Sequence, residues 1–137
     1  MSQADIESLR ARYEAVSRGD RAAVYRDVQP GFTLKTVEQV PNAGTYLGAE
    51  AATRFVEDLW EPFEELTLEP QEFFERGDQI VVLLVVRARH RGSSAVVENR
   101  IGALWTMRDG KPLMLEMYPK REQALEAAGL TPTGEER

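Results

Sequence analysis

The chain has 137 residues, close to the commonest length of a single domain, and its 42% hydrophobic and 29% charged residues are typical of a globular protein. Seventeen Lys and Arg against 23 Asp and Glu give a formal net charge of -6, which argues against nucleic acid as a partner. The absence of cysteine fits a reducing cytoplasm, one histidine excludes a multi-histidine metal site, and no apolar stretch approaches the roughly 20 residues that span a bilayer.

Two helices are predicted to open the fold. Ser2 and Asp5 can form a capping pair for a first helix, in which apolar residues recur at helical spacing until Gly19. Asp20 can cap a second, short helix, and Pro30 prevents that helix from continuing.

A short strand and a third helix follow. Phe32 and Leu34 alternate with polar neighbours, which indicates a strand, and residues 41–44 contain the Pro, Asn and Gly of a loop. A broad apolar stripe then predicts a helix from about Gly48 to Trp60.

The pattern changes to strands in the second half of the chain. We expect strands that cover, in order, residues 66–74, 80–91, 95–107 and 113–118. The run IVVLLVV, residues 80–86, indicates a strand that is buried on both faces, and Asp109-Gly110 is a strong hairpin signal. Tight turns between neighbouring strands predict an antiparallel meander.

A last helix is predicted over residues 120–128, with a disordered tail over residues 131–137. Helices then lie over one antiparallel sheet, which is an α+β arrangement, and residues 1–130 form a single domain.

Four segments carry a family pattern in their order and spacing. They are RYEAVSRGD at residues 12–20, YLG at 46–48, LWTMRDGK at 104–111 and REQALEAAGL at 121–130. Together they resemble the SnoaL-like branch of the nuclear transport factor 2-like superfamily, which includes ketosteroid isomerases and polyketide cyclases. The resemblance implies a cone, in which a curved antiparallel sheet wraps around the N-terminal helices and encloses a small, mainly apolar pocket, often in a homodimer.

The isomerase chemistry of that family can be checked residue by residue. The resemblance implies that Tyr13 is the tyrosine that donates a hydrogen bond to the substrate oxygen. The catalytic base aligns near Thr36, which is not basic, and the protonated acid aligns near Gly102 or Ala103, which have no acidic group. The ketosteroid isomerase mechanism is therefore not expected.

Polyketide cyclases of this fold use an acid/base carboxylate in an apolar cavity, for which Glu98 and Glu116 are the candidates. A solvated carboxylate is the alternative for each. Histidine is the residue type whose ordinary pKa lies near neutrality, and His90 is the one histidine of the chain. Strand alternation places His90 on the apolar face of its strand. We take Tyr13, His90 and Glu98 as candidate catalytic residues, with no metal or cofactor.

The ligand-binding candidates are one amide and several aromatic residues. Asn99 alternates with apolar residues and can be a polar point on an apolar wall. The aromatic candidates are Tyr46, Phe55, Trp60, Phe63 and Trp105, for which packing in the core is the alternative.

A homodimer is also predicted. Val81, Leu83 and Val85 form the second apolar face of the central strand, and water contact with that face would be unfavourable. We expect a second chain to cover it, and the alternative cover is the terminal helix.

Two classes of function remain open. The first is cofactor-free acid/base isomerisation or cyclisation of a small, mainly apolar carbonyl compound. The second is a module of the same fold that binds a small ligand without catalysis, or that mediates a dimeric interaction. A carboxylate or His90 beside a hydroxyl donor in the cavity would favour catalysis, whereas an entirely apolar cavity would favour binding.

Overall fold

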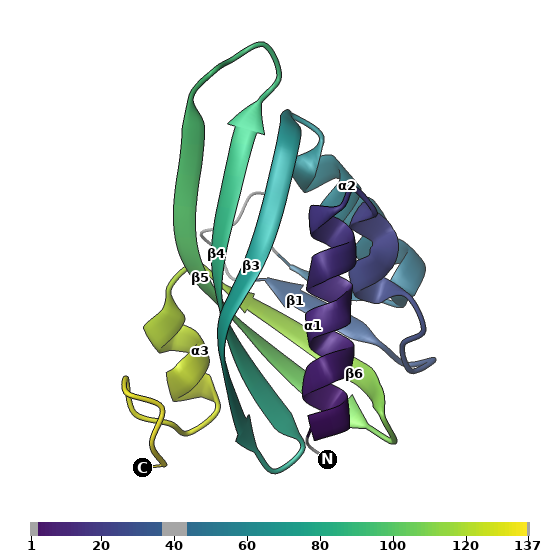
Figure 1. The fold of residues 1–137 in the computed structure, drawn as a ribbon. Helices are drawn as coiled ribbons and strands as arrows, with labels where there is room; N and C mark the ends of the chain where they lie inside the picture. Colours follow the sequence, from purple (N-terminus) through teal and green to yellow (C-terminus); the bar gives the residue numbers. More distant parts are fainter. Residues whose placement is uncertain (1–2, 37–43, 137) are drawn as a thin grey trace.

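The structure is a computed structural model in which residues 3–36 and 44–136 are described (Figure 1). The expected capping residue Ser2 and most of the expected loop at residues 41–44 lie outside the described residues.

Four helical segments and six strands make up the fold. The helical segments are α1 (Gln3–Ser17), the 3-10 helix η1 (Arg21–Tyr25), α2 (Ala49–Trp60) and α3 (Arg121–Ala127). The strands are β1 (Thr33–Thr36), β2 (Thr45–Leu47), β3 (Phe63–Arg76), β4 (Gln79–His90), β5 (Val96–Arg108) and β6 (Lys111–Tyr118). The predicted second helix is thus a single 3-10 segment, and the short strand β2 was not predicted.

The strands form one sheet in the order β2-β1-β6-β5-β4-β3. The expected antiparallel meander from β3 to β6 is confirmed, and β1 joins it by pairing in parallel with β6, so the sheet is mixed. The curved sheet is not closed into a barrel. The predicted α+β architecture, a curved sheet around the N-terminal helices, is therefore confirmed.

Helices lie on both faces of the sheet (Figure 1). On the inner face α1, η1 and α2 pack over the main core, which includes Leu9, Phe32 and Trp105. On the outer face α3 packs over a second, smaller core with Leu104 and Leu125. The two cores explain why the side chains of Ile80 to Leu84 are all buried, as the run IVVLLVV indicated.

The burial of the outer face changes the argument for a homodimer. Val81, Leu83 and Val85 are already buried within a single chain, and α3 packs against Val81 and Leu83. The C-terminal helix therefore covers Val81 and Leu83 without a second chain, which was the alternative cover, and the homodimer itself stays a prediction.

The approach of α3 to the sheet requires a glycine. A Cβ atom at Gly102 would lie 2.7 Å from the Cβ of Ala124 and 3.3 Å from the Cα of Arg121. Because Gly102 has no side chain, the α3 backbone can pack directly on β5.

Residues 131–136, which the sequence predicts to be a disordered tail, form a turn. The amide of Thr131 donates a hydrogen bond to the carbonyl of Glu135 over 2.6 Å, and Leu130 bridges to Glu136. Gly134 lies against the ring of Phe74, where a Cβ would be 2.2 Å from the nearest ring carbon. Within the described ranges, no helix is long and apolar enough to cross a membrane.

Candidate functional site

A cavity of about 250 Å³ lies on the inner face of the sheet, where the strands meet the N-terminal helical segments. Apolar side chains make up most of its wall: Val24, Leu59, Trp60, Phe63, Leu66, Leu68, Leu84, Val86, Ala88, Val97, Ile101, Ala103, Leu115, Met117 and Pro119. The remaining lining residues are Tyr13, Tyr25, Asn99 and Tyr118. Every secondary-structure element from α1 to β6 except β1 and β2 contributes to this wall.

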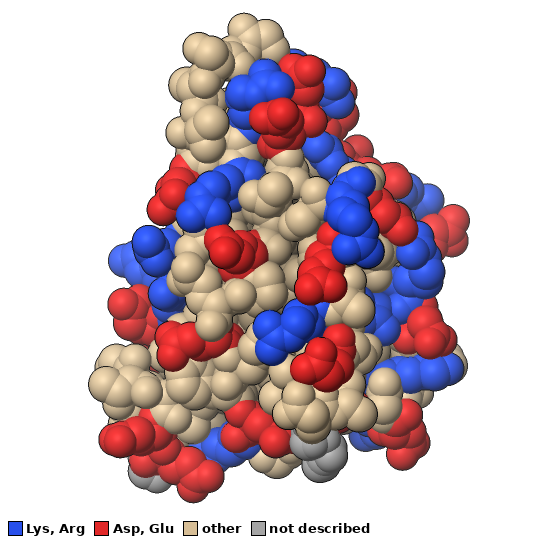
Figure 2. Space-filling model, viewed as in Figure 1, with Lys and Arg blue, Asp and Glu red and all other residues tan. Residues whose placement is uncertain are grey.

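The wall carries no formal charge. Among the described residues that line the cavity there is no Asp, Glu, Lys, Arg or His. The charged side chains instead lie on the outside, where Lys and Arg alternate with Asp and Glu over the surface in Figure 2. The polar groups of the cavity wall are therefore three phenols, one amide and the indole N–H of Trp60.

Tyr13 projects from α1 and is almost fully buried. Its hydroxyl oxygen accepts a hydrogen bond from Nε1 of Trp105 over 2.9 Å, and the two rings meet edge to face with centroids 6.2 Å apart. Burial raises the pKa of Tyr13 well above its ordinary value, although the Trp105 hydrogen bond opposes the shift. Tyr13 therefore keeps its proton and can donate a hydrogen bond.

Trp105 supports this group from below the cavity wall. Its side chain is fully buried and is not part of the lining, so Trp105 does not contact the cavity as predicted. Tyr13, which it contacts, lines the cavity instead. Because its indole donor is already used, Trp105 fixes the position of the Tyr13 hydroxyl.

Tyr25 is a second buried phenol, which sequence reasoning missed. It follows Val24 in η1 and packs against Phe32 with ring centroids 5.6 Å apart. Burial raises the pKa of Tyr25, and the nearby Tyr13 adds to the shift. Within the described part of the chain, no group forms a hydrogen bond with its hydroxyl. Tyr25 lies inside the predicted second helix, which Asp20 begins and Pro30 ends, but we did not assign its side chain to the inner face of that helix.

Tyr118 and Asn99 differ in their burial and in their contacts. Tyr118 is partly buried, and its hydroxyl donates to Oε2 of Glu116 over 3.2 Å. Burial, then the nearby Glu116, raises the pKa of Tyr118 to about 12. Asn99 lies on β5 opposite Val86, exposed to water at the open side of the cavity. Asn99 therefore presents its amide at the mouth of the cavity.

The predicted aromatic residues fall into two groups. Trp60 and Phe63 line the cavity from the end of α2 and the start of β3. Tyr46 and Phe55 stack on each other with ring centroids 4.6 Å apart and lie outside the lining, beside a shallow surface depression. The expectation that α2 faces the cavity with both Phe55 and Trp60 therefore applies only to its last turn.

The candidate acids and bases lie outside the cavity wall. His90 is exposed at the end of β4, where its ring packs against Phe63 with centroids 4.4 Å apart. Glu98 is exposed on the outer face of β5 and accepts a hydrogen bond from Nε of Arg87 over 3.1 Å. Strand alternation gives His90 the expected face, but Ala88 is the last buried residue of that face.

Comparison with known proteins connects this architecture to a family. A family model described as SnoaL-like domain matches residues 9–112. No curated protein matches the chain.

Several solved structures share the fold. An NTF2-like protein of unknown function from Burkholderia pseudomallei aligns with a TM-score of 0.74 and 22% identity over 92% of this chain and 97% of its own. TerC, crystallised with polyporic acid, aligns with a TM-score of 0.73 and 23% identity over 91% of this chain and 98% of its own. A candidate SnoaL-like polyketide cyclase from Jannaschia aligns with a TM-score of 0.72 and 20% identity over 85% of each chain. At these identities the likeness shows the fold alone.

Proposed function

The chain belongs to the SnoaL-like domain family, and we propose that it binds a small, neutral, mainly apolar molecule through an oxygen that accepts a hydrogen bond inside the cavity. One observation carries this proposal: the described lining residues include no charged side chain but place two buried phenols in the wall.

The absence of charge from the wall selects the class of ligand. An ion in this cavity would lose its hydration without gaining a partner charge, whereas an apolar ring would gain contacts with the aliphatic and aromatic wall. The volume of about 250 Å³ lies just below the range of roughly 300–1,000 Å³ that holds drug-sized ligands, so the ligand is a smaller molecule.

The two phenols select the functional group of the ligand. Tyr13 accepts its hydrogen bond from Trp105, and the Tyr25 hydroxyl has no partner among the described residues, so both keep a proton to donate. A carbonyl or ether oxygen is a suitable acceptor. A mainly apolar ketone or quinone has this combination, and TerC, a neighbour of the same fold, was crystallised with polyporic acid.

A matched pair of probes tests the choice between neutral and charged ligands. Acetophenone and benzoate have similar size and shape, but only benzoate is an anion at neutral pH. We expect acetophenone to change the fluorescence of Trp60, and benzoate to bind at least about tenfold more weakly because no cation faces it. Equal or tighter binding of benzoate would contradict the proposal.

Single-atom variants test the hydrogen bond. Tyr25→Phe removes a hydroxyl that has no protein partner among the described residues, so the free energy of unfolding should stay unchanged. The affinity for acetophenone should fall by about 2- to 13-fold, the equivalent of roughly 0.5–1.5 kcal/mol. Tyr118→Phe is the matched control, because the hydroxyl it removes already donates to Glu116. Equal losses in the two variants would argue against a directed hydrogen bond.

A catalytic role is the second candidate, and one contact favours it. The ring of His90 packs against Phe63, which lines the cavity, so the imidazole is one side chain away from a bound ligand. In this role His90 has to reach past Phe63 to remove a proton next to the carbonyl, and Tyr13 donates to the enolate oxygen that forms.

Deuterium exchange of the acetophenone methyl group, followed by NMR in D2O, separates the two candidates. If the protein only binds acetophenone, the methyl group should exchange at the same rate as in buffer without protein. A catalyst accelerates the exchange, and His90→Ala then returns the rate to that of the buffer while acetophenone still binds.

A further inference from the structure

The turn that joins α2 to β3 is bridged by one arginine side chain. Arg21, the first residue of η1, donates from Nη1 to the carbonyl of Trp60 over 2.6 Å and from Nη2 to the carbonyl of Phe63 over 2.9 Å. Trp60 is the last residue of α2 and Phe63 is the first residue of β3, so a single guanidinium joins the two ends of the turn. Both of these residues line the cavity.

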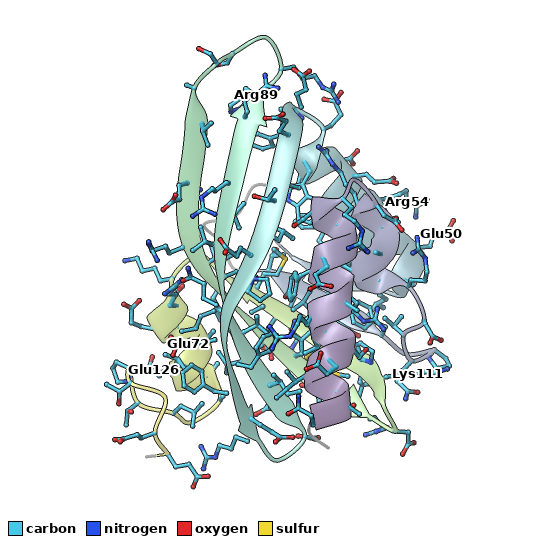
Figure 3. The ribbon with its side chains drawn as sticks, viewed as in Figure 1. Glu50, Arg54, Glu72, Arg89, Lys111 and Glu126 are labelled. Carbon is cyan, nitrogen blue, oxygen red and sulfur yellow. The ribbon has the colours of Figure 1, made fainter. Side chains whose placement is uncertain are left out.

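Two further arginines bond to the outside of the same turn. The backbone amide of Arg91 donates to the carbonyl of Pro62 over 3.0 Å, and its Nε donates to the carbonyl of Glu61 over 3.0 Å. Arg89, labelled in Figure 3, donates from Nε to the carboxylate of Glu65 over 3.1 Å. These three acceptor residues are not part of the cavity wall. Arg21 is therefore the arginine that holds the lining residues of the turn.

The bridge meets carbonyl groups that regular structure leaves open. The last carbonyls of a helix have no partner within the helix, and the ladder between β3 and β4 shifts its register between Phe63 and Glu65. A basic side chain at a helix end can simply cap it. Arg21 does more than cap α2, because its second nitrogen reaches the next element.

The segment that carries Arg21 is itself part of the cavity wall. Val24 and Tyr25, later in η1, line the cavity, and the Tyr25 hydroxyl has no hydrogen-bond partner among the described residues. Nη1 of Arg12 donates to the carbonyl of Val24 over 3.0 Å and so ties η1 to α1. One short segment thus carries a free phenol and, through Arg21, holds two aromatic lining residues.

We propose that Arg21 is a positioning residue of the binding site. By bridging Trp60 and Phe63, it holds their rings at a fixed distance from the Tyr25 hydroxyl. That distance sets which separation between ring and oxygen the site accepts in a ligand. The inference rests on the proposed function, in which the phenol meets the ligand oxygen and the aromatic wall meets its apolar part.

A conservative substitution separates the bridge from the charge. The guanidinium is a planar fork with several N–H donors, whereas lysine has one nitrogen on a flexible stem. Arg21→Lys therefore keeps the positive charge and removes the two-point bridge. Arg26→Lys is the matched control just after η1, because both terminal nitrogens of Arg26 bond to the carboxylate of Asp20 instead of to lining residues.

The first test needs no ligand. Fluorine NMR of protein labelled with 5-fluorotryptophan gives one signal for each of the two tryptophans, and Trp60→Phe assigns them. In Arg21→Lys the Trp60 signal should shift or broaden, while the signal of Trp105, which is fully buried, should stay unchanged. A general loss of stability would alter both signals, and Arg26→Lys should alter neither.

The second test measures the preferred separation of ring and oxygen by titration calorimetry. Acetophenone, phenylacetone, 4-phenyl-2-butanone and 5-phenyl-2-pentanone carry the same phenyl ring and methyl ketone, separated by zero to three methylene groups. Transfer from water alone raises the affinity by about fourfold for each methylene group. A fixed distance in the site should instead give one best length, with the longer ketones about tenfold or more below that steady rise.

The variants should then differ in selectivity. Arg21→Lys should bring the four affinities close to the steady rise, because the rings can adjust to each length. Arg26→Lys should keep the preference of the unaltered protein.

Rescue with a small cation gives a third test. Arg21 is partly exposed, so the space left by Arg21→Ala opens to water. Methylguanidinium should restore the length preference of Arg21→Ala, and methylammonium, which has the same charge but no fork, should not. Equal rescue by the two cations would assign the effect to charge and overturn the bridge.

The ligand-free and ligand-bound results fail in different ways. A Trp60 signal that is unchanged in Arg21→Lys would overturn the proposal whether or not a ketone binds. A steady rise through all four ketones in the unaltered protein would also overturn it, as would an equal loss of affinity for all four in Arg21→Lys, which a purely structural role predicts. A changed Trp60 signal in a protein that binds no ketone would support the positioning by Arg21 and contradict the proposed function.

Discussion

The two halves of the β4–β5 hairpin are covered in different ways. The lower half, residues 80–85 and 102–107, lies between α1 on the inner face and α3 on the outer face, and its side chains are almost all buried. The upper half, residues 86–90 and 96–101, has the cavity on its inner face and water on its outer face. At the top of Figure 1 this half extends beyond the helices that cover the lower half.

The difference separates stability from binding. Two cores stabilise the lower half, whereas the upper half leaves apolar side chains free to contact a ligand. Residues that bind are frequently drawn from the less stable part of a fold. Changes in the lower half should therefore affect folding, and changes in the upper half should affect binding.

The largest effect should come from a truncation in the lower half. Leu104 is 1% exposed and packs under α3. Leu104→Ala should lower the free energy of unfolding by about 2–5 kcal/mol, because it removes buried methyl groups and leaves a void. Val97→Ala, in the upper half of the same strand, is the matched change and should cost far less. Urea unfolding measures both, and similar losses would erase the distinction between the halves.

The buried phenols should make the protein sensitive to alkali. Because the pKa values of Tyr13 and Tyr25 are raised in the folded protein, both states hold the phenol protons below pH 10, and above it the unfolded state loses them first. Each tyrosine should then cost about 1.4 kcal/mol of stability at pH 11.

Urea unfolding at pH 8 and pH 11 measures this loss, and Tyr25→Phe should reduce it by the share of one tyrosine. Absorbance at 295 nm gives the complementary result, since the two buried phenols should ionise only as the protein unfolds. Their ionisation in the folded state would mean that the cavity opens to water.

A smaller effect is expected where α3 meets β5. Gly102→Ala places a Cβ atom 2.7 Å from that of Ala124, so the helix has to move away from the sheet. Overpacking of this kind costs about 1–3 kcal/mol. Gly31→Ala is the matched control, because a Cβ atom there has no neighbour within 4 Å among the described residues. Thermal unfolding compares the variants. An unchanged melting temperature for Gly102→Ala would show that α3 is loosely attached.

The smallest effect should come from the ion pairs of the upper half. Arg87 bridges Glu69 and Glu98 over 2.7 and 3.1 Å on the exposed outer face. Water and salt screen such pairs, so Arg87→Ala should change stability little, and the change should shrink further in high salt. A large loss of stability in thermal unfolding would show that the outer face is part of the scaffold.

The fold was predictable from the sequence because its signals are local. The run IVVLLVV, the Asp109-Gly110 turn and the stripe of α2 each fix one element, and the four family segments fix their order. The element that covers the outer face of the sheet was harder to predict. Periodicity indicates that Val81 and Leu83 are buried, but not whether α3 or a second chain buries them. The signal was Gly102, whose missing side chain admits the helix.

The site was less predictable because it depends on where each strand emerges from the core. Tyr13 was assigned to the site from the family resemblance, Asn99 from strand alternation, and Trp60 and Phe63 as aromatic candidates, and all four line the cavity. His90 has the expected face but lies beyond the last buried residue of β4. Alternation specifies a side of the sheet, and the length of the covering helices specifies how far along a strand that side stays buried.

Amide hydrogen exchange along β5 tests the contrast between the halves most directly. Amides of residues 102–107 should exchange only through global unfolding, and the edge amides of residues 96–101 should exchange much faster. Equal exchange rates in the two segments would contradict the division of the sheet into a stable half and a binding half.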